Sequence, residues 1–216
     1  MKQKIVLLGA PGSGKGTQAK VLAEKLEYRH ISTGDILRDA LKNGTPVGLQ
    51  AKSYMEKGEL VPDEVMATIL LDALKEDDAK KGFILDGFPR TVNQARILEK
   101  GLSDNDGSID LAIELIASRE LIVERLTQRR ICKDCGAVYN LKNIPPKTEG
   151  ICDSCAGPLY QRNDDKEETI DRRLQIYQQQ VQGLLEFFKE KGVLESVDGG
   201  LPREETLNMM LALIRA

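Results

Sequence analysis

Short apolar runs alternate along this chain with longer segments in which apolar residues recur at helical spacing. The short runs are apolar on both sides of the chain, which is typical of strands that helices cover on both faces of a parallel sheet. The predicted strands are residues 5–8, 83–85, 111–117 and 194–197. The predicted helices are residues 15–26, 63–75, 91–100, 119–129, 170–191 and 204–215. This alternation predicts a three-layer α/β fold with a parallel sheet and right-handed crossovers.

Two stretches interrupt the alternation. Residues 32–61 contain two short helical pieces, broken at Gly44 and at Gly58, and no predicted strand. Residues 128–165 lack helical periodicity and contain all four cysteines. We therefore predict two insertions mounted on one core, which consists of residues 1–31, 62–127 and 166–216.

The most specific local motif is a glycine-rich loop, GAPGSGKGT, at residues 9–17. It follows a predicted strand and opens a predicted helix, which is the context that a phosphate-binding loop requires. Glycine lets backbone N–H groups point inward at phosphate oxygens, and the helix N-terminus adds to the positive field. Lys15 is then expected to reach the outer phosphates of a nucleotide. The residues expected to bind the phosphates are Gly12, Ser13, Gly14, Lys15, Gly16 and Thr17.

The loop departs from the strict pattern at one position. The residue after the lysine is usually a serine or threonine whose hydroxyl contacts magnesium. Here that residue is Gly16, and the hydroxyl follows at Thr17. This change is compatible with nucleotide binding. Gly16 has no hydroxyl, however, so position 16 cannot coordinate magnesium directly in this way. The alternative is an ordinary glycine-rich turn, which the lysine and the strand–helix context disfavour.

The four cysteines form two C-x-x-C pairs, a spacing that indicates a metal site before it indicates disulfides in a cytoplasmic protein. Four thiolates suit tetrahedral zinc and leave no position for a catalytic water, so the ion is expected to be structural. The alternatives are disulfides, a redox-active dithiol, or iron in place of zinc. A segment of under about 40 residues buries little core, and a metal crosslink would supply the missing order. The candidate ligands are Cys132, Cys135, Cys152 and Cys155.

Composition narrows the class of protein. The chain has 216 residues, of which 41% are hydrophobic and 30% charged, and this favours a folded protein over a disordered one. A net charge of −3 gives no reason to expect nucleic acid as the partner. No apolar stretch approaches the roughly 20 residues of a membrane span, and the first apolar run is too short for a signal peptide. We therefore expect a cytoplasmic protein with neither membrane nor nucleic-acid partners.

Three further motifs follow the loop in order: STGD at residues 32–35 with Arg38, GELVP at residues 58–62, and LDGFPR at residues 85–90 with Gln94. On these motifs, the loop and the cysteine pairs, the sequence resembles the adenylate kinase family over essentially its whole length, in the long-lid bacterial form with a zinc-binding lid. The resemblance implies reversible phosphoryl transfer between ATP and AMP to give two ADP, with Mg²⁺ as cofactor and a structural Zn²⁺. It also implies that residues 32–61 are an AMP-binding flap and residues 128–165 a lid over ATP.

The resemblance also assigns roles to single residues. Gln94 would read the edge of the AMP adenine, Arg125 would lie against the ATP adenine, and Pro89 would follow a cis peptide bond. The AMP site would be lined by Thr33, Arg38, Glu59, Leu60, Val61, Gly87, Phe88, Pro89, Arg90, Gln94, Arg162 and Arg173. The ATP site would be completed by Arg125, Arg129, Val138, Tyr139 and the backbone of Leu201.

This chemistry suits the residue types present. The acceptor phosphate has a second pKa of about 6, so it is mostly an anion at neutral pH and needs no general base. The difficulty is repulsion between two polyanions, which lysine, arginine and magnesium relieve by positioning and by neutralising charge. Asp86 ends a short apolar strand, where ligands of an open sheet gather, and we expect it to bind magnesium through ordered water; the alternative is a turn or N-cap aspartate. The residues expected to carry the chemistry are Lys15, Arg38, Arg90, Arg129, Arg162, Arg173 and Asp86.

Two other functions remain open. The first is a nucleoside monophosphate kinase with another acceptor, or with GTP as donor, and the residues around Thr33 and Gln94 would discriminate it. The second is a zinc ribbon that binds nucleic acid, since tandem C-x-x-C pairs occur there as well. That function predicts a basic ribbon rich in aromatic residues. Here Asp134, Glu149 and Asp153 lie among the lysines, which disfavours it.

Overall fold

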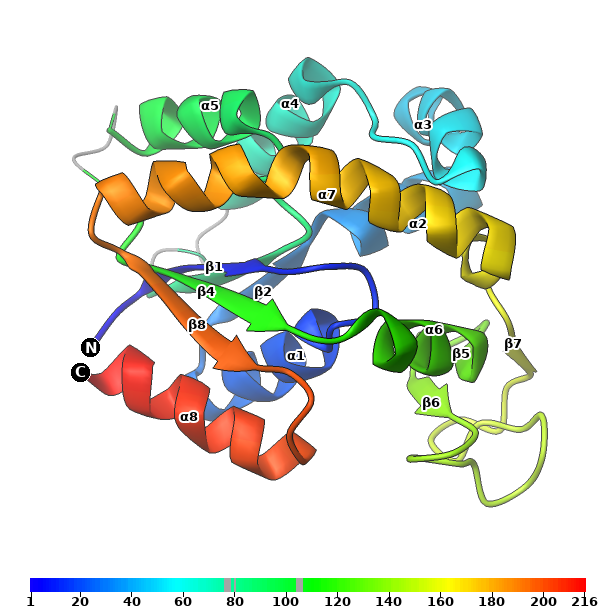
Figure 1. The fold of residues 1–216 in the computed structure, drawn as a ribbon. Coiled ribbons are helices and arrows are strands. Elements are labelled where there is room, and N and C mark those ends of the chain that lie inside the picture. The colour runs from blue at the N-terminus through cyan, green and yellow to red at the C-terminus, as the bar shows by residue number, and fades with distance from the viewer. Residues whose placement is uncertain (76–78, 80, 104–106) are drawn as a thin grey trace.

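A computed structural model describes residues 1–75, 79, 81–103 and 107–216 of the chain. Its central sheet has the strand order β2-β3-β1-β4-β8, and every neighbouring pair is parallel (Figure 1). The strands are β1 (Lys4–Leu8), β2 (Arg29–Ser32), β3 (Phe83–Asp86), β4 (Leu111–Ile116) and β8 (Leu194–Asp198). β1 lies in the middle, so its residues after the first are buried on both faces. The predicted parallel sheet is confirmed.

The sequence pattern missed one strand of this sheet, β2. It lies at the edge, and Ile31 is its one fully buried side chain, so no apolar run marks it. In the parallel register Ser32 lies beside Asp86, and Leu7 of β1 lies on the other side of Asp86. The carboxyl ends of three strands therefore meet at one edge of the sheet, where ligands of such folds bind.

Helices cover both faces of the sheet (Figure 1). Val6 and Leu8 of β1 belong to the core under α4, α5 and α7, whereas Ile5 and Leu7 belong to the core under α1 and α8. These helices are α1 (Lys15–Leu26), α4 (Asp63–Leu74), α5 (Val92–Ser103), α7 (Glu167–Glu190) and α8 (Arg203–Arg215). The three-layer prediction is confirmed. None of the helices in the described part of the chain combines the length and the apolar character that a membrane span needs.

Between β2 and α4 the chain forms two short helices, α2 (Thr33–Lys42) and α3 (Pro46–Lys57). Gly44 separates them with a φ of 65°, a left-handed conformation that glycine favours. Thr45 then caps α3, because its side chain accepts a hydrogen bond from a backbone N–H of the first turn. Gly58, with a φ of 70°, ends α3 in the same left-handed conformation. The two predicted helical pieces and their break points are confirmed.

The second insertion follows α6 (Arg119–Thr127) and contains a small antiparallel sheet with the strand order β6-β5-β7. Its strands are β5 (Arg129–Cys132), β6 (Val138–Asn140) and β7 (Leu159–Tyr160). The 3-10 helix η2 (Asn163–Asp165) connects β7 to α7. Strands this short show no clear alternation of apolar and polar residues. The sequence therefore predicted only that residues 128–165 are not helical. For the same reason the predicted helix 119–129 was too long at its end, where β5 begins.

Candidate active site

The loop that connects β1 to α1 depends on glycine for its conformation. Gly9, Gly12 and Gly14 have φ values of 134°, 81° and 110°, which other residues rarely adopt. A Cβ at Gly9 would lie 2.5 Å from Leu115 O, and one at Gly12 would lie 2.8 Å from Leu126 Cγ. The loop therefore packs so closely against β4 and α6 that glycine is required. The predicted strand–loop–helix context is confirmed.

Lys15 is the first residue of α1, and its side chain turns back over the loop. Its Nζ donates hydrogen bonds to Gly9 O at 2.6 Å and to Ala10 O at 2.8 Å. Burial lowers the pKa of Lys15 to about 8; nearby Asp86 acts to raise this pKa, while Arg90 lowers it further. The ammonium group is thus a buried positive charge, which an anionic ligand would stabilise.

Asp86, the last residue of β3, lies against this loop. A Cβ at Gly16 would be 2.9 Å from Asp86 Oδ2, so the carboxylate occupies space that a serine or threonine side chain would need. The departure from the strict loop pattern therefore makes room for Asp86. Burial acts to raise the pKa of Asp86, but His30, with Nε2 3.8 Å from Oδ2, and Lys15 outweigh it, so this pKa lies below its ordinary value. An anionic carboxylate here fits Mg²⁺, which prefers oxygen ligands.

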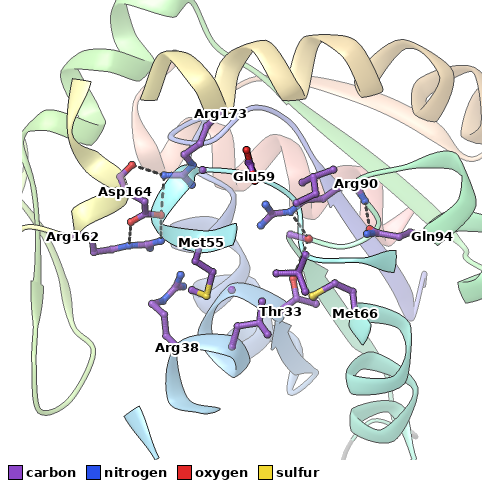
Figure 2. A pocket seen from close by; sticks show the side chains of 16 residues that line it. Thr33, Arg38, Met55, Glu59, Met66, Arg90, Gln94, Arg162, Asp164 and Arg173 are labelled. Atoms are coloured by element: carbon purple, nitrogen blue, oxygen red, sulfur yellow. Dashed lines mark hydrogen bonds and ion pairs between the residues drawn. The ribbon is translucent and has the colours of Figure 1, made fainter. Parts of the chain in front are cut away.

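A pocket lies among α2, α3, the start of α4 and the loop after β3 (Figure 2). Two groups donate to Gly87 O and shape this loop: Arg90 Nε at 2.8 Å and Thr33 Oγ1 at 3.0 Å. The peptide bond between Phe88 and Pro89 is cis, as expected. The residues that line the pocket are Thr33, Gly34, Leu37, Arg38, Met55, Gly58, Glu59, Leu60, Val61, Met66, Gly87, Arg90, Gln94, Arg162, Asp164 and Arg173.

The pocket brings together most of the residues expected in the AMP site, but not Phe88 and Pro89. The Phe88 side chain is 1% exposed and belongs to the core under α5, so a contact between Phe88 and a ligand would come from its backbone. Pro89 lines the neighbouring cleft instead. The apolar part of the lining, Leu37, Met55 and Met66, was not predicted, because apolar residues at helical spacing look the same whether they face a core or a ligand.

Two adjacent carboxylates hold the arginines at the base of the second insertion. Arg162 Nε donates to Asp164 Oδ1 at 2.7 Å, and Arg173 Nη1 lies 3.0 Å from Asp164 Oδ2 (Figure 2). Arg129 Nε donates at 2.8 Å to Asp165, which is fully buried. Burial acts to raise the pKa of Asp164, but Arg173 and Arg162 outweigh it and hold this pKa well below its usual range. Burial also lowers the pKa of Arg173 to about 10.

A larger cleft runs from the phosphate loop to the second insertion. Arg125 borders it, and its Nη1 donates to Ser13 O at 3.1 Å, which joins α6 to the loop. Val138 and Leu201 also line the cleft. Tyr139 lines it too, but its side chain is buried and packs with the cysteines. A contact between Tyr139 and a nucleotide would therefore come from its backbone.

The four cysteines converge on one point. The Sγ atoms of Cys132, Cys135, Cys152 and Cys155 all lie within 4.8 Å of one another, and none of the four forms a disulfide. Tetrahedral zinc with Zn–S bonds of about 2.3 Å would place the sulfurs about 3.8 Å apart, so the cluster fits a structural zinc. The Tyr139 hydroxyl lies 3.4 Å from Cys152 Sγ, where it can donate a hydrogen bond to the thiolate that a metal requires.

Comparison with known proteins gives the family. The sequence model of the family described as adenylate kinase matches residues 7–193 of the chain. The chain belongs to the adenylate kinase family. It is 53% identical over 201 residues to an adenylate kinase from Clostridium tetani, which covers 93% of each chain. It is 50% identical over 211 residues to one from Thermodesulfovibrio yellowstonii, covering 98% of each, and 53% identical over 195 residues to one from Geobacillus sp., covering 90% of each.

As a member of the adenylate kinase family, the chain is a nucleotide-binding phosphotransferase with a phosphate group as acceptor. No sequence motif marked Asp164 and Asp165 as functional residues. The available signal was the pair of adjacent acidic residues directly after Arg162 and Asn163. A charge run of this kind is common on solvated surfaces, so only the structure shows that these two carboxylates bind the arginines.

Proposed function

We propose that the chain catalyses the reversible, magnesium-dependent reaction ATP + AMP = 2 ADP. One observation carries the proposal. Four arginines border both the small pocket and the larger cleft that contains Lys15 and the phosphate loop. Cationic groups therefore lie between the two binding spaces. A phosphoryl group that passes from one nucleotide to the other would have its negative charge neutralised there. The four arginines are Arg38, Arg90, Arg162 and Arg173.

The residues would act by positioning and by neutralising charge, without a general base. The guanidinium groups would grip phosphate oxygens in pairs, and Lys15 would leave its backbone acceptors to bind the outer phosphates of ATP. Asp86 would hold Mg²⁺ through ordered water, and the ion would neutralise charge on the ATP phosphates. The lowered pKa of Lys15 supports this, because it comes mainly from burial of a positive charge, which a bound polyanion would stabilise.

We assign the two nucleotides to the two spaces. The AMP phosphate would bind Arg38 and Arg90, and its adenine would meet Gln94. The rest of the AMP site would be Thr33, Glu59, Leu60, Val61, Gly87, Arg162 and Arg173. ATP would bind Gly12, Ser13, Gly14, Lys15, Gly16, Thr17, Arg125, Arg129, Val138, Tyr139 and Leu201. Support comes from the pockets, which group most of these residues in the same two sets.

We further propose that residues 32–61 close over AMP and residues 128–165 over ATP, which would expel water and suppress hydrolysis. Support comes from the arginines that these insertions bring to the site, Arg38 from α2 and Arg129 from β5. A structural zinc on the four cysteines would stiffen the lid. The unpaired cysteines suit a reducing compartment, and we propose a cytoplasmic monomer that maintains adenine nucleotide balance.

The test mixes the purified protein with Mg-ATP and, in turn, AMP, CMP, UMP and GMP, and measures the diphosphates formed. We expect AMP to be the best acceptor. Lys15→Ala should lower turnover by a factor of about 100 to 1,000 with the fold intact. Lys75→Ala, which removes an exposed lysine at the end of α4, is the matched control and should behave like the wild type. No diphosphate with any acceptor, or full turnover in Lys15→Ala, would refute the proposal.

A further inference from the structure

Two hydrogen bonds of opposite sense hold the side chain of Gln94. Its Oε1 accepts from the Arg90 N–H at 2.7 Å (Figure 2), and its Nε2 donates to Asp63 Oδ1 at 2.7 Å. Gln94 is 1% exposed, so water competes little for these bonds. A backbone N–H can only donate and a carboxylate can only accept. The two partners therefore fix which end of the amide is oxygen and which is nitrogen.

Asp63 is itself held in place. It is the first residue of α4, where the helix dipole favours a carboxylate. Its Oδ2 accepts from Thr91 Oγ1 and from Asn93 Nδ2, both at 3.0 Å. With Gln94, three donors surround this carboxylate, so it presents only acceptor positions to the amide.

The two bonds leave the Gln94 amide with one acceptor position on Oε1 and one donor position on Nε2 for a ligand. The edge of adenine offers the complementary pair, an amino donor at N6 and an acceptor at N1. The edge of a 6-oxopurine, guanine or hypoxanthine, offers the reverse pair, a carbonyl acceptor at O6 and an N1–H donor. The amide could match the second pair only by turning over. It would then face Arg90 N–H with a donor and Asp63 with an acceptor, so both bonds would be lost.

We propose that Asp63 is a positioning residue that makes the site selective for adenine over 6-oxopurines, because it blocks the reversed orientation of the Gln94 amide. The inference rests on the proposed function, since it concerns the acceptor nucleotide of that reaction. Asp63 is not among the residues that line the pocket, and it acts on the base only through Gln94. Selectivity here comes from the penalty on the wrong base as much as from the bond to the right one.

The test compares AMP with inosine monophosphate, whose base carries the reversed pair and lacks the 2-amino group of guanine. Asp63→Asn keeps the side-chain shape but replaces the acceptor-only carboxylate with a carboxamide that can also donate. We expect the ratio of kcat/KM for AMP over inosine monophosphate to fall about fivefold, through KM rather than kcat, because a bond to a charged acceptor is replaced by a weaker neutral one. The Kd for inosine monophosphate divided by the Kd for AMP, both measured by calorimetry, should fall by the same factor.

Two controls separate positioning from a general structural role. Asp72→Asn makes the same change at an exposed position of α4 and should leave the ratio unchanged. In a Gln94→Met background, Asp63→Asn should not lower the ratio further, because its route to the base is gone.

An unchanged ratio in Asp63→Asn, or an equal loss for both nucleotides, would overturn the inference. A wild-type protein that makes no ADP from ATP and AMP would instead refute the proposed function. If Asp63→Asn melts well below the wild type, Asp63→Ser serves the same comparison, because serine also suits a helix start and its hydroxyl can donate as well as accept.

Discussion

The guanidinium group of Arg129 lies against the carboxylate of Asp165 with two bonds: Nε is 2.8 Å from Oδ2, and Nη2 is 2.5 Å from Oδ1. Asp165 is fully buried in η2, and Arg129 begins β5, so the pair ties the start of the small antiparallel sheet to the segment just before α7. Arg173 adds a second positive charge 3.6 Å from Asp165 Oδ1. A buried anion thus positions two of the cations that the proposed chemistry requires.

Removal of this anion should destabilise the protein. Asp165→Asn would leave Arg129 facing a neutral amide, and breaking a buried ion pair costs about 3 to 5 kcal/mol. For a chain of this length, that loss corresponds to a fall in Tm of about 6 to 20 °C. Thermal unfolding followed by circular dichroism measures it. Asp171→Asn, which removes an exposed partner of Arg119, should lower Tm by less than about 4 °C. Equal shifts in the two variants would contradict the prediction.

Binding of ATP should depend on pH through Lys15. Its pKa in the free protein is about 8, below the ordinary 10.5, so Lys15 loses its proton as the pH rises through 8. A bound polyanion favours the charged form and should raise this pKa again. We therefore expect proton uptake on ATP binding between about pH 8 and pH 10 and weaker binding there than at pH 7. Calorimetry in two buffers with different ionisation enthalpies measures the uptake. Its persistence in Lys15→Met would assign the effect to another group.

Loss of the proposed zinc should destabilise residues 128–165. Cys132→Ser removes one of four converging thiols, and we expect zinc content to fall well below one ion per chain and Tm to fall by about 5 °C or more. Elemental analysis and thermal unfolding measure these two effects. A strong chelator should lower the Tm of the wild type but not that of the variant. Glu149→Ser, an exposed change on the same insertion, is the control. Unchanged zinc content in Cys132→Ser would show that the cysteines are not ligands.

The features that sequence predicted well depend on residues that are neighbours along the chain. The phosphate loop needs glycines and a lysine within residues 9–17, between a strand and a helix, and all of these are visible in the printed sequence. The spacing of the cysteines likewise gives two local pairs, and the structure brings them together. The layers of the core followed from apolar periodicity, because every covered strand must be apolar on both faces.

The features that sequence missed depend on which distant segments meet. The bond between Gln94 and Asp63 joins residues 31 positions apart, and no local pattern indicates it. Phe88 sits inside a functional motif, yet its side chain packs in the core. The edge strand β2 was not predicted from the apolar pattern, because Ile31 is its one buried residue. In each case tertiary packing decides the role of a residue whose local context is ambiguous.

Gly16→Ala should raise the Mg²⁺ requirement of the enzyme without lowering its Tm. The added methyl would lie 2.9 Å from Asp86 Oδ2, so the carboxylate would have to move. Alanine is the better helix former by about 1 kcal/mol, and Gly16 lies in the first turn of α1, so Tm should not fall. We expect the Mg²⁺ concentration for half-maximal activity to rise about tenfold, because Asp86 would no longer present its oxygens in place. Titration of activity with Mg²⁺ at fixed ATP measures this change. Asp86→Asn should raise the Mg²⁺ requirement in the same way, and unchanged magnesium dependence in both variants would remove Asp86 from the magnesium site.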